Sequence, residues 1–239
     1  VRKIAQTADH IVTVSESAKT DIMKILGVPE DRITNTYQAV NIPEKYRNKP
    51  AELVGREVEG TFGLGYKNYY LFWGSIEPKK NVGRIIEAYL ASGVKPPLVI
   101  VGAQAWKSED ELKLLDDDHV RTLIQIDNET RVKRKVIQLS YAPFPLLVSL
   151  IRGAKATIFP SLYEGFGLPV LESMLLGTPV ISSNTASIPE VAGEAAILVD
   201  PYDAQKIAQA IRDLDADEGL RSTLIAAGLI QAQQFSEEA

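Results

Sequence analysis

The stretch FPSLYEGFGLPVLESMLLGTPVI, residues 159–181, joins an apolar run that ends at Pro160 to a helical pattern opened by Pro169. An apolar run, a glycine turn and a helix in this order form the strand–turn–helix unit of an α/β protein. Glycines in the turn let the backbone approach a ligand closely, and the helix N-terminus offers free N–H groups. Residues 159–181 therefore predict one unit of a parallel sheet, with a phosphate-binding turn after its strand.

The same alternation continues over residues 66–215. The apolar runs are mostly continuous, as is typical of parallel strands that are covered on both faces; they lie at 69–74, 97–102, 135–140, 156–161, 179–183 and 195–200. Helical patterns separate or follow them, at 81–93, 143–154, 168–177 and 203–214. We therefore predict the α/β class with a Rossmann-like, doubly wound parallel sheet. In the first of these helices, Asn81 is a candidate N-cap and Gly93 a candidate end.

The first sixty residues differ from this core. Residues 8–28 predict a short strand, an N-cap at Ser15 and an amphipathic helix, and residues 31–43 predict a second extended segment. One such unit is too small to bury a core of its own. Residues 50–65 contain one proline and four glycines and suggest a linker or boundary loop. We interpret residues 1–62 as the end of an upstream domain followed by a linker.

The composition narrows the class of protein. Of the 239 residues, 45% are hydrophobic and 24% charged, as in ordinary globular proteins. The net charge of −5 gives no general attraction for nucleic acid. The chain has no cysteine, which excludes disulfides, zinc–thiolate sites and a thiol nucleophile, and we expect a cytoplasmic protein. No apolar run approaches the roughly 18 residues of a membrane span.

Two carboxylates flank the glycine turn of the opening stretch. Glu164 comes just before the turn, and we expect Glu172 in the first turn of the helix, so that both face the same mouth. A carboxylate repels phosphate but accepts hydrogen bonds from sugar hydroxyls. The combination indicates a ligand with phosphates in the middle and sugars on either side, which describes a nucleotide sugar.

These residues also carry a resemblance. The segments EGFGLPVLE (164–172) and GTPVI (177–181) resemble the signature of retaining glycosyltransferases of family four (group 1), which have the GT-B fold. GSIEPKKN (74–81) resembles the glycine-rich segment of their mannosyltransferase-like members. Residues 8–22 and 186–203 match as well, so the resemblance covers about residues 8–239.

The resemblance implies a division into parts. In this family two Rossmann-like domains face each other across a cleft, and the C-terminal domain binds the sugar nucleotide. Residues 1–62 would be the C-terminal end of the N-terminal, acceptor-binding domain plus a linker, and residues 63–222 the nucleotide-sugar-binding domain. Residues 223–239 would be a truncated C-terminal helix. The chain would then lack most of the N-terminal domain.

The resemblance also implies roles for single residues. Glu164 would contact the transferred sugar, Glu172 the ribose hydroxyls, and Lys80 would neutralise the diphosphate leaving group. The remaining donor-binding positions would be the backbone amides of Gly165, Phe166, Gly167 and Leu168, together with Gly74, Ser75, Lys79 and Tyr141.

One position departs from the pattern of the family. Ser75 stands where many members have an arginine that supplies a second cation to the diphosphate, although members with a segment like GSIEPKKN commonly lack it. We expect Lys79 to compensate in part. Tyr141, in the loop after a strand, is expected near the base.

The expected reaction is transfer of a hexose from a nucleoside-diphosphate sugar, with GDP-mannose as the leading candidate, to a glycan or lipid-linked acceptor with retention. Lys80 and the helix N-terminus place positive charge where the leaving group becomes negative, so we expect no metal and no cofactor. This chain would bind donor but catalyse little by itself. The alternatives are a non-catalytic nucleotide-binding module, or a GT-B phosphorylase or epimerase.

Three further features have simpler interpretations. Asp116, Asp117 and Asp118 contain an Asp-x-Asp pattern that can bind metal, but they follow a charged helical pattern, and we interpret them as a solvated run. RVKRK (131–135) could contact an anionic membrane, which would make the protein peripheral at the inner membrane face, but a solvated surface is favoured. We assign no role to His10 or His119.

Overall fold

A computed structural model describes the whole chain apart from residues 107, 117–120, 127–128 and 237–239. Its centre is a six-stranded, wholly parallel sheet in the order β10-β9-β8-β3-β4-β7. The strands are β3 (Tyr70–Trp73), β4 (Leu98–Val101), β7 (Val136–Leu139), β8 (Ala156–Phe159), β9 (Val180–Ser183) and β10 (Ile197–Val199). Numbered along the chain, this order is the 3-2-1-4-5-6 order of doubly wound sheets.

Each strand lies within one of the six predicted apolar runs, so the predicted class and sheet are confirmed. Every residue of β3, β4, β8 and β9 is buried, because helices cover both faces of the sheet. The aromatic run 69–73 is part of this core, and the Trp73 ring packs edge-on against Phe159 with centroids 4.6 Å apart.

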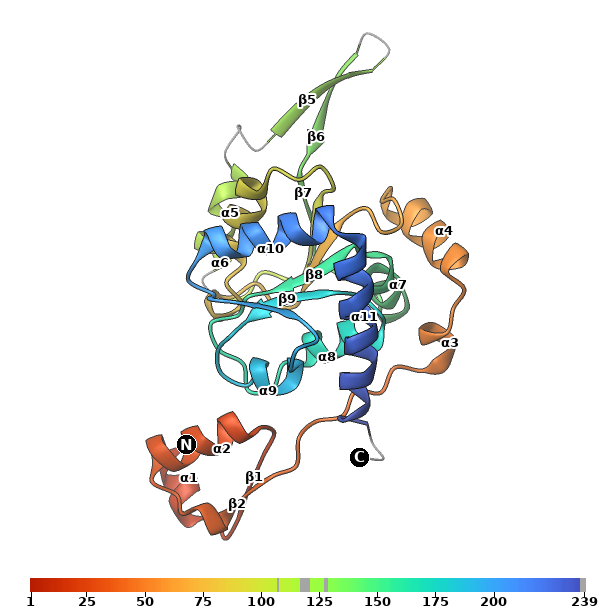
Figure 1. Ribbon diagram of the computed structural model, residues 1–239. Coiled ribbons are helices and arrows are strands. Elements are labelled where there is room, and N and C mark those ends of the chain that lie inside the picture. The colour runs from red at the N-terminus through yellow and green to blue at the C-terminus, as the bar shows by residue number, and fades with distance from the viewer. Residues whose placement is uncertain (107, 117–120, 127–128, 237–239) are drawn as a thin grey trace.

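The helices pack in pairs around the sheet (Figure 1). Contacts join α5 to α10, α4 to α7 and α8 to α11. Their bounds are α4 (Ala51–Phe62), α5 (Val82–Ser92), α7 (Phe144–Gly153), α8 (Leu168–Leu175), α10 (Ala204–Ala216) and α11 (Glu218–Gln233). Shorter elements are η2 (Pro78–Lys80), α6 (Ser108–Leu112), η3 (Lys113–Asp116) and α9 (Ile188–Ala192). As expected, α5 ends at Gly93, which has a left-handed backbone with φ of 71°.

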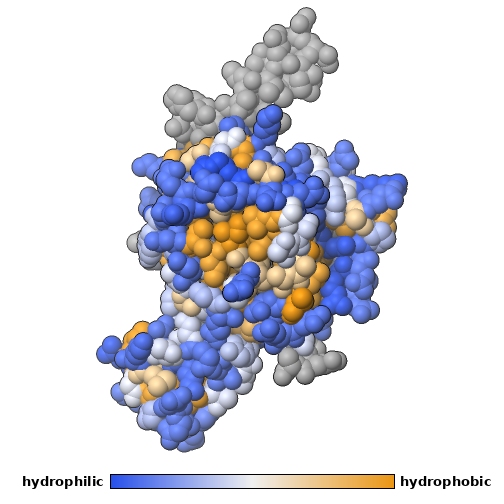
Figure 2. Space-filling view, viewed as in Figure 1, coloured by the Kyte–Doolittle hydropathy of each residue, from blue (hydrophilic) through white to orange (hydrophobic). Residues whose placement is uncertain are grey.

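Figure 2 shows the same face of the molecule as a surface. Apolar residues gather in its middle, between α10 and α11, and hydrophilic residues cover the rims. The edge strand β10 is only partly covered, with Ile197 and Leu198 half-buried. In the described part of the chain, no helix combines the length and the apolar character needed to cross a bilayer.

The expected linker loop at residues 50–65 is wrong. Most of it is helix α4 (Ala51–Phe62), which follows the short helix α3 (Glu44–Arg47) and packs on α7. Val54 and Val58 lie four residues apart and are fully buried in the main core, and Gly63 ends the helix in a left-handed conformation. The glycine content pointed to a loop, but burial of one apolar face stabilises the helix.

A hairpin at residues 121–134 was not predicted. β5 (Arg121–Ile126) pairs antiparallel with β6 (Glu129–Arg134) and projects from the domain (Figure 1). Residues 131–134 of the charged segment that we interpreted as a solvated surface lie in β6.

The N-terminal residues form a separate small unit (Figure 1). It contains α1 (Arg2–Thr7), β1 (Ile11–Thr13), α2 (Glu16–Leu26), η1 (Glu30–Arg32) and β2 (Ile33–Asn35). We call these residues, 1–35, the N-terminal unit. β1 and β2 pair in parallel over a small core formed by Ala5, Val28 and Ile33. The predicted cap is confirmed, because the Ser15 hydroxyl accepts a hydrogen bond from the Ala18 amide at 3.0 Å.

Candidate functional site

The loops that follow β3 and β8 meet at the carboxyl edge of the sheet. These two strands are neighbours although they are the first and fourth in chain order, so the order of the sheet reverses between them. Ligands of doubly wound sheets bind at such a reversal. The Leu162 amide donates to the Lys79 carbonyl at 2.8 Å, which ties the two loops together.

An ion pair links the same two loops. The Lys80 ammonium lies 2.7 Å from a carboxylate oxygen of Glu164, 84 residues further along the chain. The two side chains are 16% and 13% exposed, so water screens the pair only in part. Lys80 has three N–H donors, and a single carboxylate oxygen uses one of them. The structure thus brings the two predicted catalytic residues together.

The second carboxylate, Glu172, meets the last residue of β3. Trp73 donates its indole N–H to Glu172 at 3.3 Å. Burial raises the pKa of Glu172, and the hydrogen bond from Trp73 opposes this shift. Glu172 is the fifth residue of α8 and so lies in its second turn. The expectation of the first turn was wrong, because the helix begins at Leu168.

The backbone amides of the glycine turn have no acceptor assigned among the described residues. Gly167 has φ of +115°, and a Cβ atom at this position would lie 2.7 Å from the Ile188 side chain, so the position requires glycine. A Cβ atom at Gly165 would meet nothing within 4 Å. In the described part of the chain, no acceptor is assigned to the amides of residues 165–168, which lead into the N-terminus of α8. These amides can hold an anion.

Phe166 contributes its backbone and not its ring to this turn. The ring is 3% exposed and packs edge-on against Phe235 with centroids 5.5 Å apart. Leu168 is likewise half-buried against the main core. The apolar side chains of the turn therefore anchor it, while the amides stay open.

The other predicted donor-binding residues lie around this centre. Gly74 ends β3 with φ of +134°, and its carbonyl approaches Gly102 so closely that a Cβ atom there would be 1.8 Å away. The side chains of Ser75 and Lys79 both engage Glu77, at 3.1 and 3.4 Å. Lys79 is therefore paired on its own loop.

Tyr141 lies further along the same edge of the sheet. It follows β7, which is two strands away from β3, and it is 75% exposed. The structure places Tyr141 at the predicted edge without a contact to the Lys80–Glu164 pair.

Asn81 occupies the predicted N-cap position of α5, but its side chain does not cap the helix. Its backbone is left-handed with φ of 62°, and its side chain makes no cap bond. Instead its buried amide group donates to the carbonyls of Pro160 and Pro201, at 2.9 and 2.7 Å. This ties together the loops after β3, β8 and β10. Asparagine adopts the left-handed region more readily than most residues, so an asparagine just before a helix could have indicated this backbone conformation.

The N-terminal unit lies against this site. The Tyr163 hydroxyl donates to Asp21 at 2.7 Å, and the Ser15 hydroxyl donates to the Gly165 carbonyl at 2.7 Å. A hollow of about 440 Å³ lies between α2 and the loops after β8 and β9. Sequence reasoning placed Ser15 only as a helix cap and missed its contact with the glycine turn.

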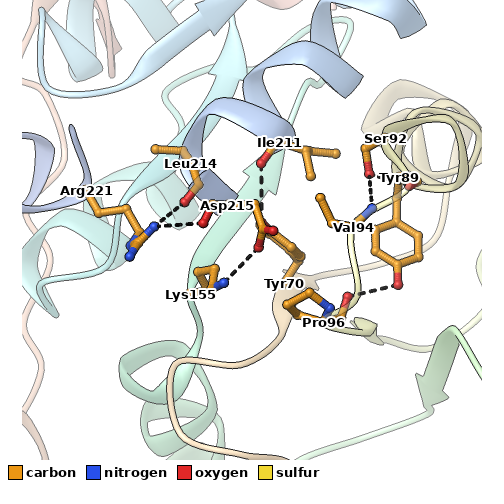
Figure 3. Close-up of polar contacts among 10 residues, drawn as sticks. All are labelled: Tyr70, Tyr89, Ser92, Val94, Pro96, Lys155, Ile211, Leu214, Asp215 and Arg221. Carbon is orange, nitrogen blue, oxygen red and sulfur yellow. Dashed lines mark hydrogen bonds and ion pairs between the residues drawn. The ribbon is translucent and has the colours of Figure 1, made fainter. Parts of the chain in front are cut away.

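A second hollow, of about 680 Å³, lies at the opposite, amino end of the sheet. Figure 3 shows its polar contacts. Lys155 lies 2.7 Å from Asp215, and Asp215 also accepts a hydrogen bond from the buried Tyr70 hydroxyl at 3.0 Å. Arg221 donates to the carbonyls of Leu214 and Asp215 at the end of α10. These groups satisfy one another, so we interpret this hollow as structural.

The described residues contain no cluster of three or more histidine, cysteine or acidic side chains that could hold a metal ion. Asp116 ends η3, while Asp117, Asp118 and His119 lie outside the described residues. His10 lies on the surface, with its ring 2.8 Å from the Thr34 hydroxyl.

Residues 62–230 match the family described as glycosyl transferases group 1, and the chain belongs to this family. O-antigen chain mannosyltransferase B of Escherichia coli is 34% identical over 236 residues, covering 97% of this chain and 58% of that protein. O-antigen chain mannosyltransferase RfbU of Salmonella typhimurium is 29% identical over 206 residues, covering 86% and 51%. The chain thus spans about half the length of these relatives.

Solved structures of low sequence identity share the fold. HepE of Anabaena in complex with UDP-glucose superposes with a TM-score of 0.79 at 18% identity, covering 98% of this chain and 61% of that one. Sucrose-phosphate synthase of Thermosynechococcus elongatus gives a TM-score of 0.77 at 20% identity, covering 99% and 57%. The fold is that of GT-B glycosyltransferases, as predicted.

Proposed function

We propose that the protein to which this chain belongs transfers a hexose from a nucleoside-diphosphate sugar, with retention, to a glycan or lipid-linked acceptor. The observation that carries the proposal is the Lys80–Glu164 pair at the reversal of the sheet, next to a turn whose four amides have no acceptor assigned among the described residues. The similarity to O-antigen mannosyltransferases favours mannose, and GDP-mannose is the leading donor.

The residues have complementary roles in this proposal. Departure of a nucleoside diphosphate builds negative charge, and fixed positive groups lower the barrier where that charge develops. Lys80 and the amides of residues 165–168 supply such groups. Glu164 keeps Lys80 in place and offers its second oxygen to a sugar hydroxyl, and Glu172 accepts from the ribose hydroxyls. In this proposal, neither the stabilisation of the leaving group nor the binding of the sugar and ribose hydroxyls uses a metal ion or a cofactor.

The division of labour follows the proposed domains. Residues 63–222 would bind the donor, and the N-terminal unit would contribute the adjoining end of the acceptor-binding domain. The predicted boundaries at 62/63 and 222/223 do not separate packed units, because α4 packs in the main core and α11 (Glu218–Gln233) begins before residue 223. The chain alone would bind donor and catalyse little. Contact of residues 131–135 with an anionic membrane, and a cytoplasmic location, stay predictions.

Donor binding by this chain is the first test. A thermal-shift panel would compare GDP-mannose, UDP-glucose, UDP-N-acetylglucosamine and the free diphosphates. A ligand at 100 times its dissociation constant stabilises the folded chain by about 2.7 kcal/mol. We expect GDP-mannose and GDP to give the largest shifts, and Lys80→Met to reduce them strongly. The donor proposal fails if no nucleotide sugar stabilises the chain.

Transfer is tested with the full-length protein. NMR of the first product formed from an α-configured donor is expected to show an α-glycosidic bond, and a β-bond would reject retention. Donor binding without any transfer to isolated membrane glycans would instead identify a non-catalytic nucleotide-binding module. A donor-independent reaction with inorganic phosphate would identify a phosphorylase, and interconversion of the donor sugar an epimerase.

A further inference from the structure

Two serine hydroxyls hold three consecutive carbonyls of the glycine turn. The Ser187 hydroxyl oxygen lies 2.9 Å from the carbonyl of Glu164 and 2.8 Å from that of Phe166. The Ser15 hydroxyl donates to the carbonyl between them, that of Gly165, at 2.7 Å. Both serines are fully buried. Every carbonyl from residue 164 to residue 166 thus faces a serine hydroxyl.

The position of a carbonyl fixes the direction of the next amide. In a trans peptide the C=O and N–H groups of one plane point in opposite directions. The carbonyls of Glu164, Gly165 and Phe166 share their peptide planes with the amides of residues 165, 166 and 167. Each carbonyl held by a serine therefore turns the amide of the same peptide plane away from that serine, and no acceptor is assigned to these three amides among the described residues.

Helix capping does not account for these hydroxyls. Ser187 stands at the N-cap position of α9, yet its side chain makes no cap bond and reaches the turn instead. Ser15 does cap α2, but only as an acceptor. A serine hydroxyl carries a single hydrogen, and in Ser15 that hydrogen is donated to Gly165.

Ser15 comes from the N-terminal unit, and α9 holds it next to the glycine turn. The Glu190 carboxylate accepts hydrogen bonds from the Glu16 amide at 2.7 Å and the Ser17 amide at 3.2 Å, and these are the first two residues of α2 after the Ser15 cap. Glu190 lies three residues after Ser187, so one short helix both supplies the first serine and fixes the second.

We propose that Ser187 and Ser15 are positioning residues that orient the amides of residues 165–167 toward the diphosphate of the donor. Ser15 makes this part of the donor site depend on the N-terminal unit, so that two regions of the chain complete it together. The inference rests on the proposed function, in which these amides bind the diphosphate.

The test compares GDP and guanosine binding by titration calorimetry. Ser187→Ala removes two of the contacts, and Ser15→Gly removes the third while keeping a residue that is tolerated at an N-cap. We expect GDP affinity to fall about threefold to tenfold in each variant, and guanosine affinity to change by less than about twofold. Ser15→Thr keeps a hydroxyl and is expected to restore GDP binding.

Ser182→Ala is the matched control. Ser182 is equally buried and donates to the Phe159 carbonyl at 2.7 Å, outside the glycine turn. This control is expected to lower Tm as much as Ser187→Ala while leaving GDP affinity unchanged.

The outcomes separate the inference from the proposed function. If the wild-type chain binds GDP no better than guanosine, the proposed diphosphate site is wrong. If it prefers GDP and both serine variants keep that preference, the positioning role is rejected. Should Ser187→Ala not fold, Ser15→Gly decides alone, since retained GDP affinity rejects the role and a selective loss supports it.

Discussion

Two lysine–carboxylate pairs with the same geometry lie at opposite ends of the sheet. Lys80 and Glu164 at the carboxyl end are 2.7 Å apart, and so are Lys155 and Asp215 at the amino end. Both lysines are 16% exposed. The carboxylates differ, with Glu164 13% and Asp215 30% exposed, but both are largely buried, so neither distance nor lysine burial separates the pair that we assign to the donor site from the pair that we assign to the fold.

The surroundings distinguish them. Around Lys155–Asp215 the helices α5 and α10 end, so the local backbone potential is negative and the lysine offsets it. Around Lys80–Glu164 the helix α8 begins, preceded by amides without an acceptor. Because the N-terminus of a helix carries partial positive charge, Lys80 does not stabilise α8 through the helix dipole. The contrast teaches that unfilled hydrogen-bonding capacity marks a site better than an ion pair does.

Matched substitutions of the two lysines give the largest expected effect. Lys80→Met is expected to weaken GDP binding by about 1.5–3 kcal/mol, because it removes a charge-assisted contact. Lys155→Met is expected to leave GDP affinity unchanged. Titration calorimetry with GDP and guanosine checks this, and an equal loss for both ligands in Lys80→Met would show that Lys80 supports the fold.

For the free energy of unfolding, we expect the larger effect from Lys155→Met and the smaller one from Lys80→Met. Lys155→Met leaves Asp215 without its cation beside two helix C-termini, and a loss of about 1–2 kcal/mol is expected. Lys80→Met leaves Glu164 near a helix N-terminus, where a carboxylate is favourable, and a change within about 0.5 kcal/mol is expected. Urea unfolding of both variants measures the difference. Equal losses would contradict the role that we give to the helix ends.

Glu172 sharpens the comparison through pH. Because burial raises its pKa in the folded chain, the unfolded state gives up this proton first as the pH rises above about 4. The wild-type chain therefore loses stability relative to Glu172→Gln between pH 4 and 7. We expect Tm of the variant to equal the wild-type value at pH 4 and to exceed it at pH 7, while nucleotide binding falls. A difference independent of pH would rule out this account.

The smallest expected effect is that of metal removal. Lys80 and the amides already supply positive charge at the proposed diphosphate site, whereas magnesium needs clustered oxygen ligands. Donor binding by this chain and transfer by the full-length protein are expected to persist in EDTA, and also after Asp116→Asn and Asp118→Asn together. If donor binding or transfer strictly required magnesium and was lost in the double variant, the site would instead include residues 116–118.

Much of the fold could be predicted from single segments. The six sheet strands are covered on both faces, so each is a continuous apolar run that needs no partner to be recognised. The hairpin β5–β6 and helix α4 were missed for the opposite reason. Helix α4 is rich in glycine, and its packing on α7 decides its structure. Strand β6 is rich in charged residues, and its pairing with β5 decides its structure.

The candidate site divides in the same way. The sequence by itself determined the glycine turn, the presence of a helix after it and the identity of Lys80, Glu164 and Glu172, because these follow from local spacing and from the family signature. The tertiary structure alone decided that Lys80 pairs with Glu164, that Asn81 ties three loops together, and that Ser15 and Ser187 hold the carbonyls of the turn. Most of these contacts join residues more than 75 positions apart, and Ser187 acts on carbonyls of the preceding strand–helix unit, so no local pattern of residue types could record them.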